Sequence, residues 1–169
     1  MDPAVDRLVT AYRDLVQPRM RLLPMYNPEL KVEAVSFKIH EGRPCGVLLT
    51  PWFMNLVLLP AEHDEWSGMA PGENLRVTFP AGDYLCMLSM PEGIPPHLSL
   101  PLFNSVEGFV DQDTACRVAE EIMQRLYVQT DDPTQATPVD AELNKSGLKR
   151  RLSRRAMLMG LLPPGDDKK

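Results

Sequence analysis

The chain has 169 residues, of which 44% are hydrophobic and 24% are charged, as expected for one soluble globular domain with a modest tail. This composition excludes a wholly disordered chain. The sequence has no run of about 18 consecutive apolar residues, which excludes a membrane-spanning helix. The N-terminus does not have the basic start followed by an apolar stretch that marks a secretory signal. The net charge of −5 combines an acidic body over residues 1–144 with a basic segment from Lys145 to Arg155, which has six basic and no acidic residues. Because the acidic body would repel phosphate, we expect no nucleic-acid binding.

Residues 3–17 predict an amphipathic helix, because apolar residues recur there at the spacing of one helical face. Asp2 is placed to cap its first turn, and Pro18 is expected to end it. Alternating or continuous apolar runs, bounded by proline, glycine and polar turns, then predict a series of strands. These strands are expected at 31–39, 45–50, 52–59, 74–79, 84–90 and, as a short last strand, 98–102.

A second amphipathic helix is predicted over residues 112–128, with Asp111 as its N-cap. The order of helix, strands and helix predicts an α+β domain over residues 1–128, in which an N-terminal and a C-terminal helix pack on an antiparallel sheet of about five strands. The chain then turns polar, so we expect a flexible linker over 129–147. Basic residues followed by apolar ones form a C-terminal tail, residues 148–169, which is expected to be flexible.

Motifs for catalysis and metal binding are missing from the sequence. It contains neither a Gly-x-Ser-x-Gly nucleophile motif nor a glycine-rich phosphate loop, so we predict no catalytic residue and no enzyme activity. Residues 63–65, His-Asp-Glu, are adjacent and do not have the spacing that converges on one metal, so no metal site and no cofactor is predicted. Cys45, Cys86 and Cys116 form no C-x-x-C pair, and we expect them to be small core residues of a cytoplasmic protein.

A dense cluster of aromatic, methionine and amide side chains follows Pro51 and is the candidate partner-binding surface: Trp52, Phe53, Met54 and Asn55. On a half-exposed edge of the sheet these side chains would grip an apolar peptide. The alternative is that they fill the core of the sheet, as continuous apolar runs commonly do. Both interpretations are compatible with the sequence.

A resemblance extends over residues 8–162, and its most specific part is Thr-Pro-Trp-Phe-Met-Asn-Leu-Val-Leu-Leu-Pro at 50–60. Further matching segments are Leu-Pro-Met-Tyr-Asn-Pro at 23–28, Leu-Ser-Leu-Pro-Leu-Phe at 98–103 and Ser-Arg-Arg-Ala-Met-Leu-Met-Gly at 153–160. On these segments the chain resembles the HybE-type chaperones of nickel–iron hydrogenase assembly, with the HoxT and HupJ branch preferred.

The resemblance implies a non-catalytic accessory chaperone for the maturation of an uptake nickel–iron hydrogenase. The partners that it implies are small or large subunit precursors, with the small subunit and its twin-arginine signal preferred, and other hydrogenase accessory proteins. An alternative function is a redox accessory that protects the hydrogenase or its iron–sulfur clusters under oxygen. The absence of paired cysteines in the sequence argues against bound iron or iron–sulfur groups.

The tail contains a segment, residues 153–158, that imitates the twin-arginine export motif, with Met157 where the motif has phenylalanine. Its apolar part is shorter than the roughly 7–15 residues of an export signal, and it is far from the N-terminus, so export is not expected. We hypothesise that Arg154, Arg155, Met157 and Leu158 bind the partner, or occupy the chaperone's own signal-peptide site when no client is bound. The alternative is a plain basic helix.

Overall fold

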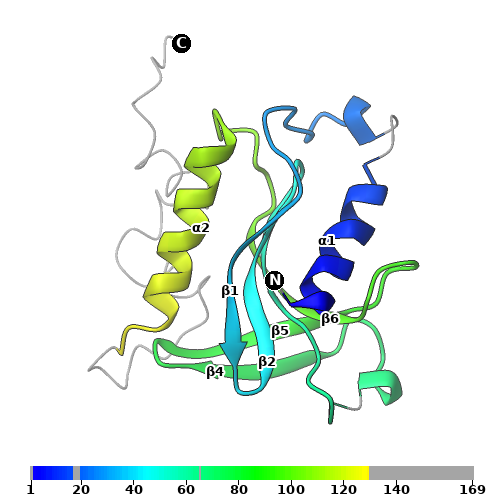
Figure 1. Ribbon diagram of the computed structural model, residues 1–169, viewed down its shortest axis with the longest axis vertical. Coiled ribbons are helices and arrows are strands. Elements are labelled where there is room, and N and C mark those ends of the chain that lie inside the picture. The colour runs from blue at the N-terminus through cyan, green and yellow to red at the C-terminus, as the bar shows by residue number, and fades with distance from the viewer. Residues whose placement is uncertain (1, 17–19, 65, 130–169) are drawn as a thin grey trace.

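The computed structural model describes residues 2–16, 20–64 and 66–129, and its centre is a six-stranded antiparallel sheet with one helix on each face (Figure 1). The helices are α1 (Pro3–Asp14) and α2 (Gln112–Leu126). The strands are β1 (Glu33–His40), β2 (Arg43–Leu49), β3 (Met54–Leu58), β4 (Asn74–Phe79), β5 (Gly82–Ser89) and β6 (His97–Phe103). Short 3-10 turns lie at Met20–Leu22 (η1) and Trp66–Gly68 (η2). The predicted α+β class is confirmed.

The sheet has the strand order β1-β2-β3-β6-β5-β4 and therefore one strand more than the five or so expected. Each of the six predicted segments corresponds to a strand, and β6, predicted as a short last strand at 98–102, is longer than expected and lies in the middle of the sheet. Pro101 is tolerated in this central strand because pairing with β5 extends only to Ser99, and β3 has a register shift opposite Pro101.

Both helices begin where the sequence predicts. The carboxylates of Asp2 and Asp111 accept hydrogen bonds from the amides of Ala4 (2.8 Å) and Thr114 (2.7 Å), as N-caps do. Helix α1 ends at Asp14, three residues before the predicted end at residue 17, because the Val16 amide bonds to Arg13 O and tightens the last turn. Helix α2 ends two residues earlier than predicted.

The two faces of the sheet support different apolar clusters. The face toward α2 carries the larger one, to which all six strands and the apolar side of α2 contribute. The face toward α1 carries a smaller cluster, built from α1 with parts of β1, β2 and β3 and their flanking residues. Figure 1 shows β1 and β2 standing between the two helices.

The sheet curves so strongly that its two edge strands approach each other at one end. The ring of His40, the last residue of β1, stacks on Phe79 of β4 with centroids 4.3 Å apart. Its Nε2 atom lies 2.9 Å from the carbonyl oxygen of Thr78. In Figure 1 the β4–β5 hairpin accordingly runs across the lower parts of β1 and β2.

A bulge in β1 explains why the predicted period of two does not persist along this strand. The register with β2 shifts between Val35 and Lys38, and Ser36 between them has a positive φ of 53°. The Phe37 ring then lies over Gly46, where a Cβ atom would meet it at 2.3 Å. Position 46 therefore requires glycine.

The predicted linker over residues 129–147 and the predicted tail over residues 148–169 fall outside the described residues from position 130 onward. Both remain predictions.

Candidate functional site

The Thr-Pro-Trp-Phe segment forms a tight turn between β2 and β3, held by Thr50. The buried hydroxyl of Thr50 accepts hydrogen bonds from the amides of Trp52 (3.3 Å) and Phe53 (3.0 Å) and donates one to the Phe53 carbonyl (3.0 Å). That carbonyl also accepts from the Thr50 amide at 2.9 Å. The turn thus has a defined shape, which fixes the direction of the two aromatic side chains that follow Pro51.

Trp52 and Phe53 are half-buried and belong to the cluster on the α1 face. Their rings meet edge to face with centroids 5.8 Å apart, and Phe53 meets Tyr12 of α1 in the same way at 5.7 Å. Tyr12 in turn packs against His97 of β6 at 6.0 Å. A row of aromatic rings therefore leads from the partly exposed turn to the buried interface under α1.

The other two residues of the candidate cluster have different surroundings. Met54 is 0% exposed and packs in the core on the α2 face, so it presents no surface to a partner. Asn55 is half-buried and pairs with Leu48 of β2 and Pro101 of β6. Both interpretations of the sequence thus apply, each to different residues: Met54 is core, whereas Trp52, Phe53 and Asn55 retain accessible surface.

Asn27 ties the 23–28 segment to this turn, a role that sequence analysis did not identify. The Asn27 amide donates a 2.7 Å hydrogen bond to the carbonyl of Pro51. Its side-chain nitrogen donates to the carbonyls of Val106 (2.9 Å) and Phe109 (2.8 Å). The segment at 23–28, the turn at 50–53 and the loop after β6, which are distant in sequence, are therefore brought together around one residue that is 6% exposed.

Asp64, one of the two acidic residues in the 63–65 segment, has a structural partner. Asp64 binds the Arg43 guanidinium through two 2.7 Å hydrogen bonds, which lower the pKa of this carboxyl, and it also accepts from the Ala61 amide. Over residues 2–16, 20–64 and 66–129, no group of three or more His, Cys, Asp or Glu side chains is arranged to hold a metal.

Ser89, Ser99 and His97 have hydrogen-bond partners that do not form a nucleophile and base pair. The Ser89 and Ser99 hydroxyls lie 3.0 Å from each other. The Nδ1 atom of His97 lies 2.8 Å from Pro95 O, and its Nε2 atom lies 3.3 Å from the Tyr12 hydroxyl. With Nδ1 as donor, Nε2 accepts from Tyr12, and His97 serves as a packing residue.

The cysteines give little support to the redox alternative. Cys45 and Cys86 are buried as predicted, and burial raises the pKa of each thiol to about 12, so both are protonated at neutral pH. Cys116 is only half-buried, which corrects the expectation that all three are core residues. Burial and the nearby Glu33 carboxylate raise its pKa to about 11.

Four of the predicted partner-binding residues, Arg154, Arg155, Met157 and Leu158, lie outside the described residues. In the part of the chain that the structure describes, neither helix has the length and apolar content needed to span a bilayer.

Comparisons with known proteins extend over most of this chain. Residues 3–160 match the family model described as NiFe-hydrogenase assembly, chaperone, HybE. The hydrogenase expression/formation protein HupT of Azotobacter chroococcum mcd 1 is 35% identical over 144 residues, which cover 85% of this chain and 92% of HupT. A probable rubredoxin, HupJ of Rhodobacter capsulatus, is 37% identical over 127 residues, 75% of this chain, and the match spans only 46% of that protein.

The fold also matches a solved structure. The solution structure of HybE from Escherichia coli superposes with a TM-score of 0.59 at 19% sequence identity, covering 77% of this chain and 83% of that one. The family model spans almost the entire described fold, together with the tail up to residue 160. The chain therefore belongs to the HybE family of nickel–iron hydrogenase assembly chaperones.

Proposed function

We propose that this protein binds subunit precursors of a nickel–iron hydrogenase in the cytoplasm and holds them until assembly. The observation that carries the proposal is the match of residues 3–160 to the hydrogenase assembly chaperone family. The preferred client is the small subunit precursor with its twin-arginine signal. No catalytic step is assigned to the chain.

The turn between β2 and β3 is the proposed client contact. Trp52 and Phe53 combine accessible aromatic surface with a backbone that Thr50 fixes, so little conformational freedom is lost on binding. Aromatic anchors of this kind contribute a large share of the energy at protein interfaces. In the tail, Arg154, Arg155, Met157 and Leu158 are proposed to take part in client capture or release.

The experiment is an affinity pull-down from the native host with the full chain as bait, followed by mass spectrometry of the retained proteins. We expect hydrogenase subunit precursors in the eluate, with the small subunit most abundant. Recovery of the large subunit alone would refute the preferred client, and recovery of neither subunit would refute the proposed function.

The role of the tail is tested in the same assay with Arg154→Gln/Arg155→Gln. The matched control is Arg150→Gln/Arg151→Gln. It removes the same charge from the same tail, but this arginine pair is not directly followed by an apolar run. A change in recovery with the first variant alone supports a specific role for Arg154 and Arg155. An equal change in recovery with both variants would show that only the net charge of the tail matters, and unchanged recovery with both would refute a role for Arg154 and Arg155.

A further inference from the structure

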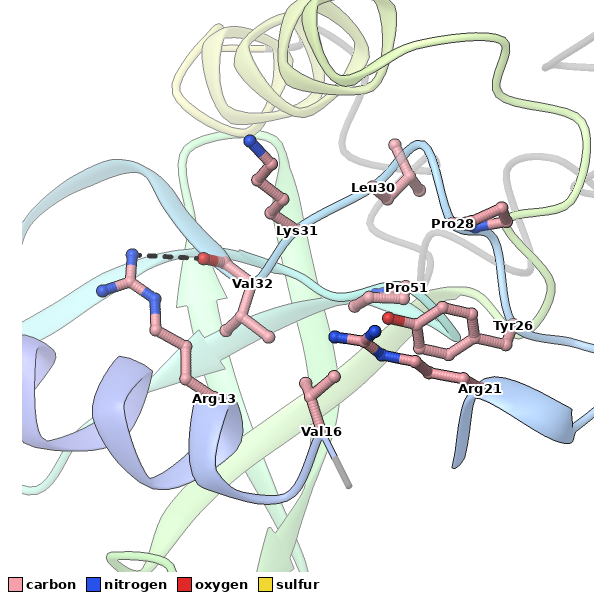
Figure 2. Close-up of a pocket in the computed structure, with 9 residues that line it drawn as sticks. All are labelled: Arg13, Val16, Arg21, Tyr26, Pro28, Leu30, Lys31, Val32 and Pro51. Atoms are coloured by element: carbon pink, nitrogen blue, oxygen red, sulfur yellow. Dashed lines mark hydrogen bonds between the residues drawn. The ribbon is translucent and has the colours of Figure 1, made fainter. Parts of the chain in front are cut away.

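A pocket of about 530 Å³ lies beside the Thr50–Phe53 turn, within the range of about 300–1,000 Å³ that is common for ligand sites. Its walls come from the end of α1, from η1, from residues 26–32 and from the start of the turn at Pro51. Arg13, Arg21 and Lys31 line it from three different segments. In Figure 2 the Arg21 guanidinium points between Val16 and Pro51, the Arg13 guanidinium points toward the Val32 carbonyl, and the Lys31 ammonium points toward α2.

The charged residues that line this pocket are all basic. Arg13, Arg21 and Lys31 line it, and no carboxylate is among its described lining residues. In the described part of the chain none of the three forms an ion pair, and Arg13 has only a long hydrogen bond, 3.4 Å, to the Val32 carbonyl. All three side chains are exposed, so an anion would reach them without opening the fold.

The rest of the pocket lining is largely apolar, and the neighbouring segment at 22–25 exposes large apolar side chains. Val16, Pro28, Leu30, Val32 and Pro51 line it, and in Figure 2 the Tyr26 hydroxyl lies beside the Arg21 guanidinium between Val16 and Pro51. The segment that carries Arg21 also exposes Leu22 (84%), Leu23 (41%) and Met25 (46%). Three large apolar side chains exposed within four residues are typical of an interaction surface.

We infer that this pocket binds a polypeptide segment of a partner in which acidic side chains alternate with apolar ones. The carboxylates pair with Arg21, Lys31 and Arg13, and the apolar side chains cover the pocket floor and the exposed 22–25 segment. The chain's own basic segment from Lys145 to Arg155 is excluded as occupant, because its charged residues are all positive. The arginine pair of a twin-arginine signal is repelled for the same reason, so a client would engage the pocket with another segment.

The inference goes beyond the proposed function, because it assigns a ligand class to the pocket whichever protein supplies the segment. The pocket is nevertheless continuous with the proposed client contact, since Pro51 lines it and the Asn27 amide bonds to the Pro51 carbonyl. Trp52 and the pocket would then contact one client over a single surface.

The test titrates the ¹⁵N-labelled full chain with a blocked peptide of sequence Gly-Ser-Glu-Leu-Glu-Val-Leu-Glu-Ser-Gly, at about 50 mM salt, where exposed charge attraction is weakly screened. Amides of residues 20–32 are expected to shift on binding. A peptide with glutamine in place of each glutamate is expected to bind about tenfold more weakly, since each exposed ion pair contributes a few-fold in affinity.

The matched variants are Arg21→Gln/Lys31→Gln and, as a control, Arg7→Gln/Arg76→Gln. Both remove two exposed positive charges, but Arg7 and Arg76 do not line the pocket. We expect the first variant to lose about tenfold in affinity for the acidic peptide and the control to lose less than about twofold.

Three outcomes would overturn the inference. They are equal losses in both variants, equal binding of the glutamine peptide, and full displacement by inorganic phosphate with no shift of residues 22–25, which would indicate a small anion in place of a peptide. If the Arg21→Gln/Lys31→Gln variant failed to bind the peptide yet retained hydrogenase subunits in the pull-down, the proposed function would stand and the pocket would not serve those clients.

Discussion

The two faces of the sheet are covered to very different degrees. On the α2 face the inward side chains of all six strands join one cluster with the apolar side of α2, and they are almost entirely apolar. On the α1 face the helix covers β1, β2 and β3, while Leu85 and Met87 of β5 remain exposed. The α1 face also contains a buried histidine, His97, and the half-buried Trp52 and Phe53. The α2 face is therefore the more completely buried of the two, whereas the α1 face, which carries the proposed client contact, retains accessible apolar groups.

The sharpest test of this comparison uses two adjacent leucines at the end of β3 that point to opposite faces. Leu58 packs on the α2 face and Leu59 on the α1 face, and both are essentially unexposed. We expect Leu58→Ala to lower the free energy of unfolding by about 3–5 kcal/mol and Leu59→Ala by about 2–3 kcal/mol, because the smaller cluster can relax into the cavity. Urea denaturation followed by tryptophan fluorescence measures both, and a larger loss for Leu59→Ala would reverse the comparison.

Asn27 supplies the next largest effect, because it is polar and buried where the α1 face meets the loop after β6. Asn27→Ala leaves the carbonyls of Val106 and Phe109 without their donor, and we expect a loss of about 2–3 kcal/mol. Asn27→Asp has the same shape and can still accept from the Glu29 amide, but it cannot donate to the two carbonyls. Asn27→Asp is therefore expected to be no more stable than the alanine variant. Near wild-type stability of either variant would show that the hydrogen bonds from the Asn27 side chain to Val106 and Phe109 are dispensable.

The sequence was sufficient for features that depend on neighbouring residues. Asp2 and Asp111 were identified as caps because a cap requires only a short polar side chain at the start of an apolar period. The predicted strands at 74–79 and 84–90 correspond to β4 and β5 to within two residues, since their alternation is local. The class of the fold follows from the order of these elements.

Features that join distant segments could not be read in the same way. Asn27, between a tyrosine and a proline, looks like an ordinary turn residue, and its partners lie about 80 positions later. Trp66 stands in a polar stretch typical of a loop, yet it is buried in the α2-face core. The basic pocket has no pattern in the sequence, because Arg13, Arg21 and Lys31 come together only when α1 and the following loop pack on the sheet.

Trp52→Ala is expected to have a moderate effect on stability and a large effect on recognition. Because the side chain is half-buried, we expect a loss of about 1–2 kcal/mol, well below the cost of removing a fully buried tryptophan. Client recovery in the pull-down should fall strongly if the ring is an interface anchor. A thermal melt beside the pull-down separates the roles: a loss of stability above about 3 kcal/mol with unchanged client recovery would make Trp52 a core residue.

The smallest expected effect is a pH dependence that originates under α1. Burial lowers the pKa of His97 below 6.5, and the neighbouring Tyr12 remains neutral because burial raises its pKa to about 12. As pH falls below about 6.5, the unfolded chain takes up a proton at His97 that the folded chain does not. The free energy of unfolding should therefore decrease toward acid, at no more than about 1.4 kcal/mol per pH unit from this group.

Substitution of His97 tests whether the decrease in the free energy of unfolding at acid pH originates on the α1 face. His97→Gln removes the titrating group and should flatten the profile between about pH 5 and 7, at some loss of stability at neutral pH because Tyr12 loses its acceptor. The matched control is His63→Gln, since His63 is exposed in the loop after β3 and does not touch α1. If α1 is held on the sheet less strongly than α2, the backbone amides of α1 should also exchange faster than those of α2 as the pH falls. The rates are compared after correction for the intrinsic pH dependence of exchange. Equal acceleration in both helices would mean that protonation of His97 loosens the whole domain, and the two faces would then be one cooperative unit.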